Sequence, residues 1–194
     1  MSRLLQALKF AAEKHASQRR KNAAATPYIN HPIEVAEHLA RVGGILDDDI
    51  LVAALLHDTI EDTNATFAEL ECLFGSRVAG IVMECTDDKC LEKVERKRLQ
   101  IANAPKKSAA AKCVKIADKT CNLASILVDP PKDWSIRRQL DYFEWAEQVI
   151  QGLVGVNERL DACVSDVLDQ GKRVLRGFEP GGEQENPRSR VFNP

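Results

Sequence analysis

Four ionisable side chains crowd into one short, otherwise apolar segment, where they could hold a metal ion. The segment LLHDTIEDT (55–63) continues the apolar run from Ile50 to Leu56. Its ionisable members are His57, Asp58, Glu61 and Asp62. On a single helix their spacing of three or four residues would place all of them on one side. Burial of three carboxylates together is unfavourable without a cation, so the segment predicts a metal site.

Two other segments contain residues that could complete such a site. His31 ends the segment PYINH and precedes Pro32, which is well tolerated in the first turn of a helix. Asp118 interrupts the apolar face of VKIADKTCNL (114–123). The expected ligands are His31, His57, Asp58 and Asp118. Two imidazoles and two carboxylates suit manganese, iron or zinc, and an octahedral ion would keep positions open for water and substrate.

Charge is segregated along the chain. Eight acidic residues and no Lys or Arg lie between positions 47 and 71, whereas ten basic and three acidic residues lie between positions 89 and 119. The basic stretch, which includes Arg96 and Lys115, could hold a polyanionic substrate while the acidic helix holds a cation. Phosphoester chemistry is the natural inference. The alternative is that much of this stretch is a solvated helical face.

Residues typical of helix starts and ends recur along the chain, and the strict alternation of apolar and polar residues that is typical of strands is almost absent. The predicted fold class is therefore all-α. Gly43-Gly44 ends one helix, and Thr66-x-x-Glu69 is a capping box that begins another. The expected helices cover 3–18, 32–42, 47–62, 66–75, 76–85, 91–103, 108–127 and 135–170.

The overall composition excludes several classes of protein. The chain has 194 residues, 44% of them hydrophobic, and a formal net charge of −2. This favours one domain over 1–176, with a Gly- and Pro-rich disordered tail over 177–194. The net charge gives no general attraction for nucleic acid, and no run approaches the roughly 20 apolar residues of a membrane span. With no signal peptide and six cysteines outside any CxxC pair, we expect free thiols and a cytoplasmic location.

Several ordered motifs resemble one family, the HD-domain hydrolases of the RelA/SpoT kind, and most closely its small stand-alone alarmone hydrolases of the metazoan SpoT-homologue type. The matching pieces, spread over roughly residues 4–155, are HASQRRK, TPYINHP, ALLHDTIEDT, FG, TDDK, ERKRLQ, KIADKTCNL and YFEWA. The resemblance implies a compact multi-helix HD-domain bundle and no synthetase module. It also implies that manganese is bound by the four residues named above, with iron or zinc as alternatives.

The resemblance also implies a reaction and a substrate. Family members remove the 3′-pyrophosphate of ppGpp or pppGpp, giving GDP or GTP and pyrophosphate. Glu61 and Asp62 match the family's catalytic pair, which orients and deprotonates the attacking water, and either could take the proton. The matching substrate residues are Arg20 and Lys21 beside the purine and Asn122 on the nucleotide. Lys115 and Arg96 of the basic stretch are further candidates for substrate phosphates.

Two departures from the family pattern leave other functions open. Ala25 replaces a common Gly, and Cys121 replaces a common aromatic residue or His; a smaller side chain there could loosen the nucleoside pocket. One alternative is therefore a phosphatase for another nucleotide, such as the 2′-phosphate of NADPH. Another is a nucleotide-binding regulator without turnover. His15 and His38 are expected to be structural or solvated rather than ligands. The oligomeric state stays open.

Overall fold

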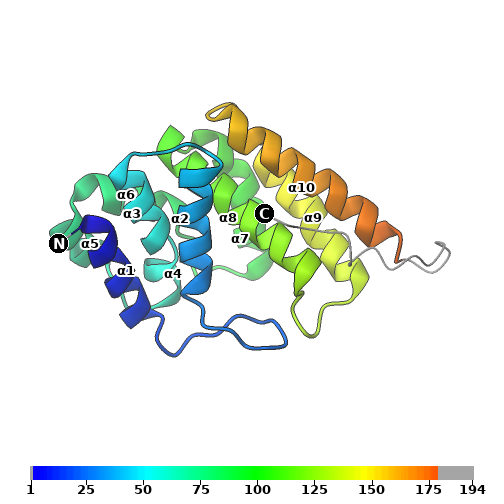
Figure 1. Cartoon of the computed structure of the whole chain (residues 1–194), viewed down its shortest axis with the longest axis horizontal. Coiled ribbons are helices and arrows are strands. Elements are labelled where there is room, and N and C mark those ends of the chain that lie inside the picture. The colour runs from blue at the N-terminus through cyan, green and yellow to red at the C-terminus, as the bar shows by residue number, and fades with distance from the viewer. Residues whose placement is uncertain (1, 179–194) are drawn as a thin grey trace.

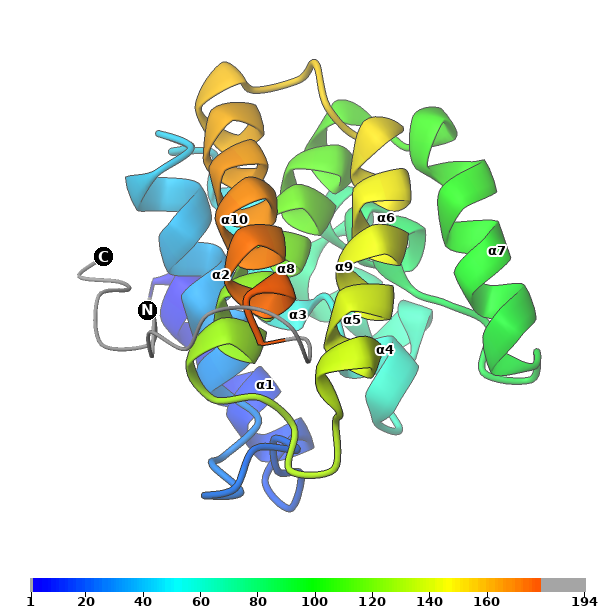
Figure 2. The same cartoon turned by 90° about the vertical axis from the view of Figure 1, so that its right-hand side faces the viewer.

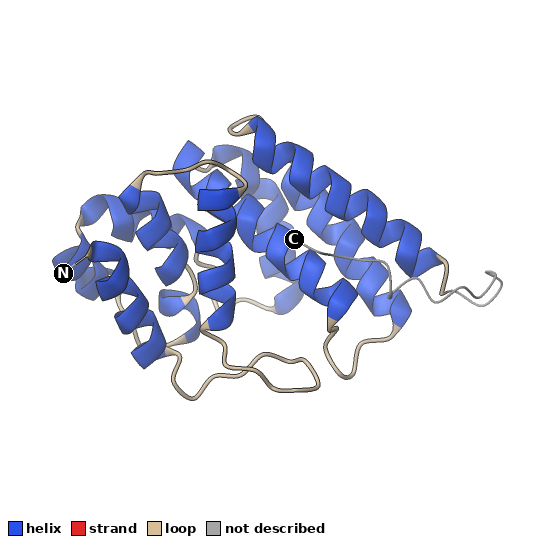
Figure 3. Cartoon of the chain, in the orientation of Figure 1, coloured by secondary structure: helices blue, strands red, loops and turns tan. Residues whose placement is uncertain are grey.

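The computed structural model describes residues 2–178, and every regular element within that range is a helix (Figure 1; Figure 3). The all-α prediction is therefore confirmed. In chain order the helices are α1 (Arg3–Lys14), α2 (Asn30–Arg41), α3 (Asp48–Leu56), α4 (Thr59–Asp62), α5 (Phe67–Phe74), α6 (Ser76–Cys85), α7 (Lys93–Asn103), the 3-10 helix η1 (Ala104–Lys106), α8 (Ala109–Val128), α9 (Ile136–Gln151) and α10 (Glu158–Arg176).

Side-chain caps define where many helices begin. Each capping oxygen accepts a hydrogen bond from a backbone N–H of the first turn, which otherwise has no intrahelical partner. The predicted capping box is confirmed on its N-terminal side, because Thr66 accepts from the backbone N–H of Glu69. The other side-chain caps are Asp47, Ser108, Ser135 and Asn157.

Helix α8 is the central element of the fold. It packs against α2 on one side and against α9 and α10 on the other (Figure 1). Four of its apolar side chains, Val114, Ile116, Ala117 and Leu123, are fully buried. The same helix also buries Lys115, Asp118 and Lys119, so the core of the bundle contains charged groups that need partners. Among the described residues, no helix is long and apolar enough to span a bilayer.

The predicted continuous helix over 47–62 is wrong. Helix α3 ends at Leu56, and the short helix α4 begins at Thr59. The hydroxyl of Thr59 donates to the carbonyl oxygen of Leu56 at 2.7 Å, and the backbone of Asp58 leaves ideal helical angles at φ −100° and ψ −2°. His57 and Asp58 therefore form a turn between two helices, and the four ionisable groups do not share one helical face.

The predicted helix over 135–170 is also wrong, because the structure divides it into α9 and α10. The connection contains Gly155 at φ +96°, a conformation that favours glycine, and Asn157, whose side chain caps α10. The predicted helix over 3–18 ends earlier, at Lys14. The predicted tail over 177–194 lies outside the described residues except for its first two positions.

One close helix contact predicts the effect of a glycine substitution. A Cβ atom at Gly171 would lie 2.1 Å from Cε1 of the buried Phe143, whereas a Cβ atom at Gly80, within α6, would meet nothing within 4 Å. We expect Gly171→Ala to lower the free energy of unfolding by about 1–2 kcal/mol, because overpacking outweighs the better helix propensity of alanine. The matched control Gly80→Ala should raise it by up to about 1 kcal/mol. Urea unfolding monitored by circular dichroism measures both, and a stabilised Gly171→Ala variant would contradict the packing shown.

Candidate metal centre and adjoining cavity

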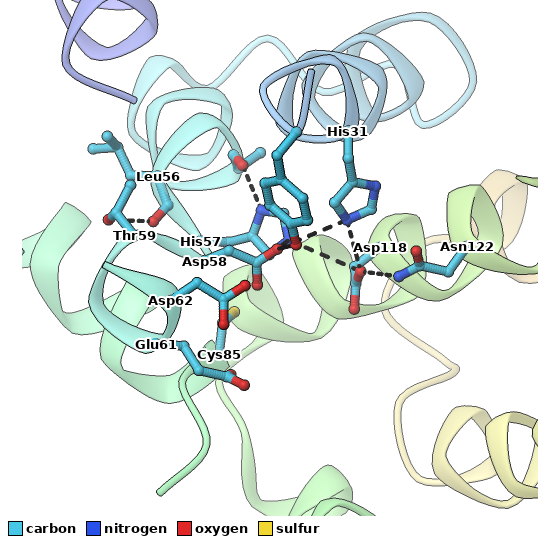
Figure 4. Close-up of polar contacts among 12 residues, drawn as sticks. His31, Leu56, His57, Asp58, Thr59, Glu61, Asp62, Cys85, Asp118 and Asn122 are labelled. Carbon is cyan, nitrogen blue, oxygen red and sulfur yellow. Dashed lines mark hydrogen bonds and ion pairs between the residues drawn. The ribbon is translucent and has the colours of Figure 1, made fainter. Parts of the chain in front are cut away.

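Three helices bring two imidazoles and a carboxylate to one point. His31 lies in the first turn of α2, His57 follows the end of α3, and Asp118 lies in the middle of α8. One ligand atom from each lies within 4.8 Å of the others, and all three side chains are buried. In Figure 4 the side chains of His31, Asp58 and Asp118 converge on one space. This group could hold a metal ion.

The hydrogen bonds of His57 fit a metal ligand. Its Nδ1–H donates to the carbonyl oxygen of Ala54 at 2.7 Å, which leaves Nε2 as the nitrogen that faces the group. That buried Nε2 has no hydrogen-bond partner within residues 2–178, although it lies 3.1 Å from Oδ2 of Asp58. Oδ2 of Asp58 also lies 3.9 Å from Nε2 of His31. Asp58 therefore adds a second carboxylate to the site, and the donor set fits a divalent cation.

Two buried lysines stabilise the negative charge of Asp118. Lys119 and Lys115 place their Nζ atoms 3.3 and 3.5 Å from Oδ2 of Asp118. Burial alone would raise the pKa of Asp118, but these two charges hold its pKa well below the usual range. Burial in turn lowers the pKa of Lys119. Asp118 is thus an anion at every physiological pH, as a metal ligand must be.

Neighbouring side chains orient both carboxylates. The hydroxyl of Tyr28 donates to Oδ2 of Asp58 at 2.5 Å, and the side-chain amide of Asn122 donates to Oδ1 of Asp118 at 2.6 Å. Arg20 in turn donates to the side-chain oxygen of Asn122 at 3.4 Å. Burial and the Asp58 charge raise the pKa of Tyr28, so its hydroxyl stays protonated as a donor. Asn122 and Arg20 are therefore linked through hydrogen bonds to the candidate metal-binding residues. These residues, His31, His57, Asp58 and Asp118, are called the metal group below.

Glu61 and Asp62 lie one turn beyond Asp58, near its side chain (Figure 4), and different partners hold each of them. Asp62 accepts from Lys89 at 2.5 Å and from the side-chain amide of Gln18 at 3.0 Å, so both of its oxygens are engaged. Glu61 accepts the backbone N–H of Asp87 at 3.0 Å through Oε2, and its Oε1 lies 3.4 Å from Nζ of Lys89. Burial raises the pKa of Glu61.

The metal group borders a cavity of about 440 Å³. Of the residues singled out in the sequence, those that line it are Arg20, Lys21, Asp58, Glu61, Asp62, Lys115, Asp118 and Asn122. Arg96 lies elsewhere, in a neighbouring cavity of about 230 Å³. Cys121 also lies elsewhere, in a groove shared with His38, and it does not line the cavity beside the metal group. Its small side chain therefore does not enlarge this cavity.

Several residues of the site are not predicted by the sequence analysis. Tyr28 and Lys89 lie inside the motifs TPYINHP and TDDK, and membership in these motifs is the sequence signal that could have identified them. The motifs do not indicate that the two side chains bind Asp58 and Asp62. His15 was expected to be merely structural; it is buried and bonded to Gln18 at 2.6 Å, the residue that donates to Asp62. The cavity also has an aromatic wall made of Trp134 and Tyr142, whose rings lie 5.5 Å apart. No spacing rule predicts the contacts of Tyr28, Lys89 and Gln18 with the carboxylates, because these contacts join segments distant in the chain.

The surroundings of His57 predict opposite effects of pH on the metal-free and metal-loaded protein. Burial alone would lower its pKa from 6.5, but the charge of Asp58 raises it to about 9. The metal-free folded state therefore holds a proton that the unfolded state loses. We expect its free energy of unfolding to be highest below pH 6.5 and to fall by about 3 kcal/mol as the pH rises through 9. Metal affinity should instead rise with pH, because binding needs neutral Nε2.

Urea unfolding with a chelator at pH 6.5 and at pH 9, beside metal titrations at the same values, measures both trends. His57→Gln serves as the control and should lose most of the pH dependence of the metal-free protein. Equal stability of the metal-free wild type at the two pH values would contradict the charge arrangement described.

Comparisons with known proteins agree with this geometry. The chain is 53% identical over 172 residues to a protein of Xenopus tropicalis named guanosine-3′,5′-bis(diphosphate) 3′-pyrophosphohydrolase MESH1, covering 88% of this chain and 96% of the relative. It is 51% identical over 169 residues to the human protein of that name, covering 87% and 94%. A solved structure described as a metazoan ortholog of SpoT that hydrolyses ppGpp matches with a TM-score of 0.86 and 46% identity, covering 90% of this chain and 97% of that one.

The family model described as "HD domain" matches residues 7–142, which include His31, His57, Asp58 and Asp118. This match and the extent of identity to the relatives agree with the expected HD-domain fold. The chain belongs to the HD-domain family and, within it, to the MESH1 group.

Proposed function

We propose that this protein is a manganese-dependent hydrolase that removes the 3′-pyrophosphate of ppGpp and pppGpp, giving GDP or GTP and pyrophosphate. One observation carries the proposal: the buried group of His31, His57 and Asp118, with the half-buried Asp58 beside it, borders the same cavity as Glu61 and Asp62. The names of the MESH1 relatives supply the substrate. We assign the catalytic unit to residues 1–176 and its location to the cytoplasm, where its six unpaired cysteines would stay reduced.

His31, His57, Asp58 and Asp118 would hold the metal. A bound manganese ion would acidify water and neutralise charge on the phosphate under attack. Nitrogen and carboxylate ligands also accept iron or zinc, and manganese is proposed because of the family. The hydrogen bonds from Tyr28 and the Ala54 carbonyl then act to keep two of the ligands in position.

Within the catalytic pair we assign Glu61 as the base that accepts the proton of the attacking water. Its raised pKa makes it a stronger base than an exposed carboxylate, and its Oε1 lacks the N–H donor that holds Oε2. Asp62, fixed by Gln18 and Lys89, would orient the attacking water. The water oxygen forms a bond to the phosphorus joined to the ribose 3′ oxygen. The bond from that phosphorus to the 3′ oxygen breaks, and the 3′ oxygen takes up a proton.

The cavity has suitable partners for the rest of a guanine nucleotide. Arg20 and Lys21 line it at the end near Asn122, where a guanidinium can stack on a purine and an ammonium can meet a phosphate. Trp134 and Tyr142 provide apolar surface for a base or a ribose. Lys115, close to Asp118, would meet the 3′ phosphates.

The activity is tested with metal-stripped protein incubated with ppGpp, with and without added manganese. We expect GDP and pyrophosphate only with metal, and a loss of at least about a hundredfold in kcat/KM in Asp58→Ala, because a ligand to the ion is lost. Ion-exchange chromatography separates the products. Asp169→Ala, which changes an exposed carboxylate on α10, is the matched control and should retain activity.

The same assay discriminates the alternatives. Phosphate released from NADPH without turnover of ppGpp would assign the centre to another nucleotide. Thermal stabilisation by ppGpp without turnover, in folded and metal-loaded protein, would make the protein a nucleotide-binding regulator and would refute the hydrolase.

The assignment of the base is tested by the pH dependence of kcat at saturating manganese. Activity should rise with pH through the raised pKa of Glu61, because the base acts only when deprotonated. We expect Glu61→Gln to lower kcat by about 10²–10⁴-fold and to remove this rise. Asp62→Asn should lower kcat but keep the rise. The reverse outcome, a rise kept in Glu61→Gln and lost in Asp62→Asn, would transfer the role of base to Asp62.

A further inference from the structure

The cavity of about 230 Å³ that contains Arg96 is not used by the proposed chemistry. It lies between α7, the end of α9 and the connection from α6 to α7; Figure 2 shows α7 running beside α9 at the edge of the molecule. Its volume corresponds to about seven waters, which is room for a phosphate or pyrophosphate ion. Three cationic side chains line it, namely Arg96, Lys107 and Lys115.

Within the described part of the chain, Arg96 has no partner for its charge. Its Nε is buried without a hydrogen-bond partner, and within residues 2–178 its guanidinium forms no ion pair. Its neighbour Arg98, by contrast, is paired through two nitrogens with Glu95. A half-buried guanidinium without a carboxylate is unusual, because burial of a charge is costly unless it is paired. An anion in the cavity would supply the missing acceptor.

The lysines of the cavity add to this positive charge. Lys107 and Lys115 donate to the backbone carbonyl oxygens of Glu84 and Cys85, and Lys115 also lies 3.5 Å from the Asp118 carboxylate, which it shares with Lys119. Burial lowers the pKa of Lys107 and the charge of Lys115 lowers it further, whereas Cys85, Glu84 and Asp87 act in the opposite direction. Two cations that repel each other across a cavity would both be stabilised by an anion between them.

The acidic residues of the cavity are already occupied. Asp87 accepts the side-chain amide of Gln100, and Asp88 accepts the backbone N–H of Cys90 at 2.9 Å. The carboxylates thus satisfy amide donors, whereas the guanidinium of Arg96 has no acceptor. Three cationic side chains against two carboxylates leave the lining with one excess positive charge, and Arg96 carries the buried donor without a partner, which favours an anionic ligand over a cation.

The cavity adjoins the proposed active site through shared residues. Lys115 and Gln100 line both cavities, and Nζ of Lys115 lies 3.5 Å from Oδ2 of Asp118. Asp87 also belongs to the wall between the two cavities, and its backbone N–H donates to Glu61. A group bound beside Arg96 is therefore separated by one layer of side chains from the metal group and from the proposed base.

The geometry points to a second anion-binding subsite in this cavity, formed by Arg96, Lys107 and Lys115, that takes a phosphate group next to the reaction centre. The inference rests on the proposed function for the source of the phosphate, which is either the distal phosphate of the bound substrate or the pyrophosphate after release. Both present phosphate oxygens, so the same cationic side chains would bind either.

The first test compares Arg96→Gln and Lys107→Gln with Lys106→Gln, a matched control on an exposed neighbouring lysine. Hydrolysis of ppGpp is measured at fixed free manganese, with pyrophosphate as product inhibitor. We expect the inhibition constant of pyrophosphate to rise about tenfold in both cavity variants, because each loses one charge-assisted contact. A parallel rise in KM assigns the subsite to the distal phosphate of the substrate. An unchanged KM assigns it to the released pyrophosphate.

The second test does not depend on turnover. Inorganic phosphate is titrated into the manganese-loaded full chain and thermal stabilisation is recorded. Half-maximal stabilisation should require about tenfold more phosphate in Arg96→Gln and in Lys107→Gln than in wild type or Lys106→Gln. This result holds even if ppGpp is not a substrate, so failure of the proposed function is distinguished from failure of the subsite. Unchanged titrations and inhibition constants in both cavity variants, or equal changes in Lys106→Gln, would overturn the subsite.

Discussion

Burial of the Asp118 carboxylate in the middle of α8 is the constraint on which the rest of the site depends. A carboxylate within an apolar core is tolerated only if cations and donors surround it, and here two lysines, a histidine and an asparagine do so. Each of these partners is itself buried or half-buried and must be positioned in turn. The charged centre and the hydrophobic packing of α8 are therefore parts of one arrangement.

Several residues of the site lie in turns or at helix ends of the bundle. His57 and Asp58 occupy the turn between α3 and α4, and His31 lies in the first turn of α2. At such positions side chains can leave the periodicity of a helix and meet residues of other helices. The regular central helix α8 supplies the remaining carboxylate, with Lys115 one turn before it and Asn122 one turn after it. Rigid helices thus hold groups whose mutual distances the chemistry requires.

A reading of the sequence identified the residue types of the site well, because they lie in short motifs with few alternatives. His31, His57 and Asp118 were selected from three separate segments, and the structure brings them within ligand distance of one another. The placement of Arg96 was harder to foresee, because a run of basic residues on one helix does not reveal which side chains face a cavity. The paired Arg98, two positions later, faces solvent instead.

The sequence by itself determined the helical class, the capped helix starts at Asp47 and Thr66, and the choice of His31, His57 and Asp118 as candidate metal ligands, since all of these depend on local spacing and residue type. Tertiary structure alone decided which groups meet. The bond from Tyr28 to Asp58 spans 30 residues, and the ion pair of Lys89 with Asp62 joins a loop to α4. Such contacts depend on how the helices pack, and packing reflects the burial of the whole core rather than any short pattern of residues.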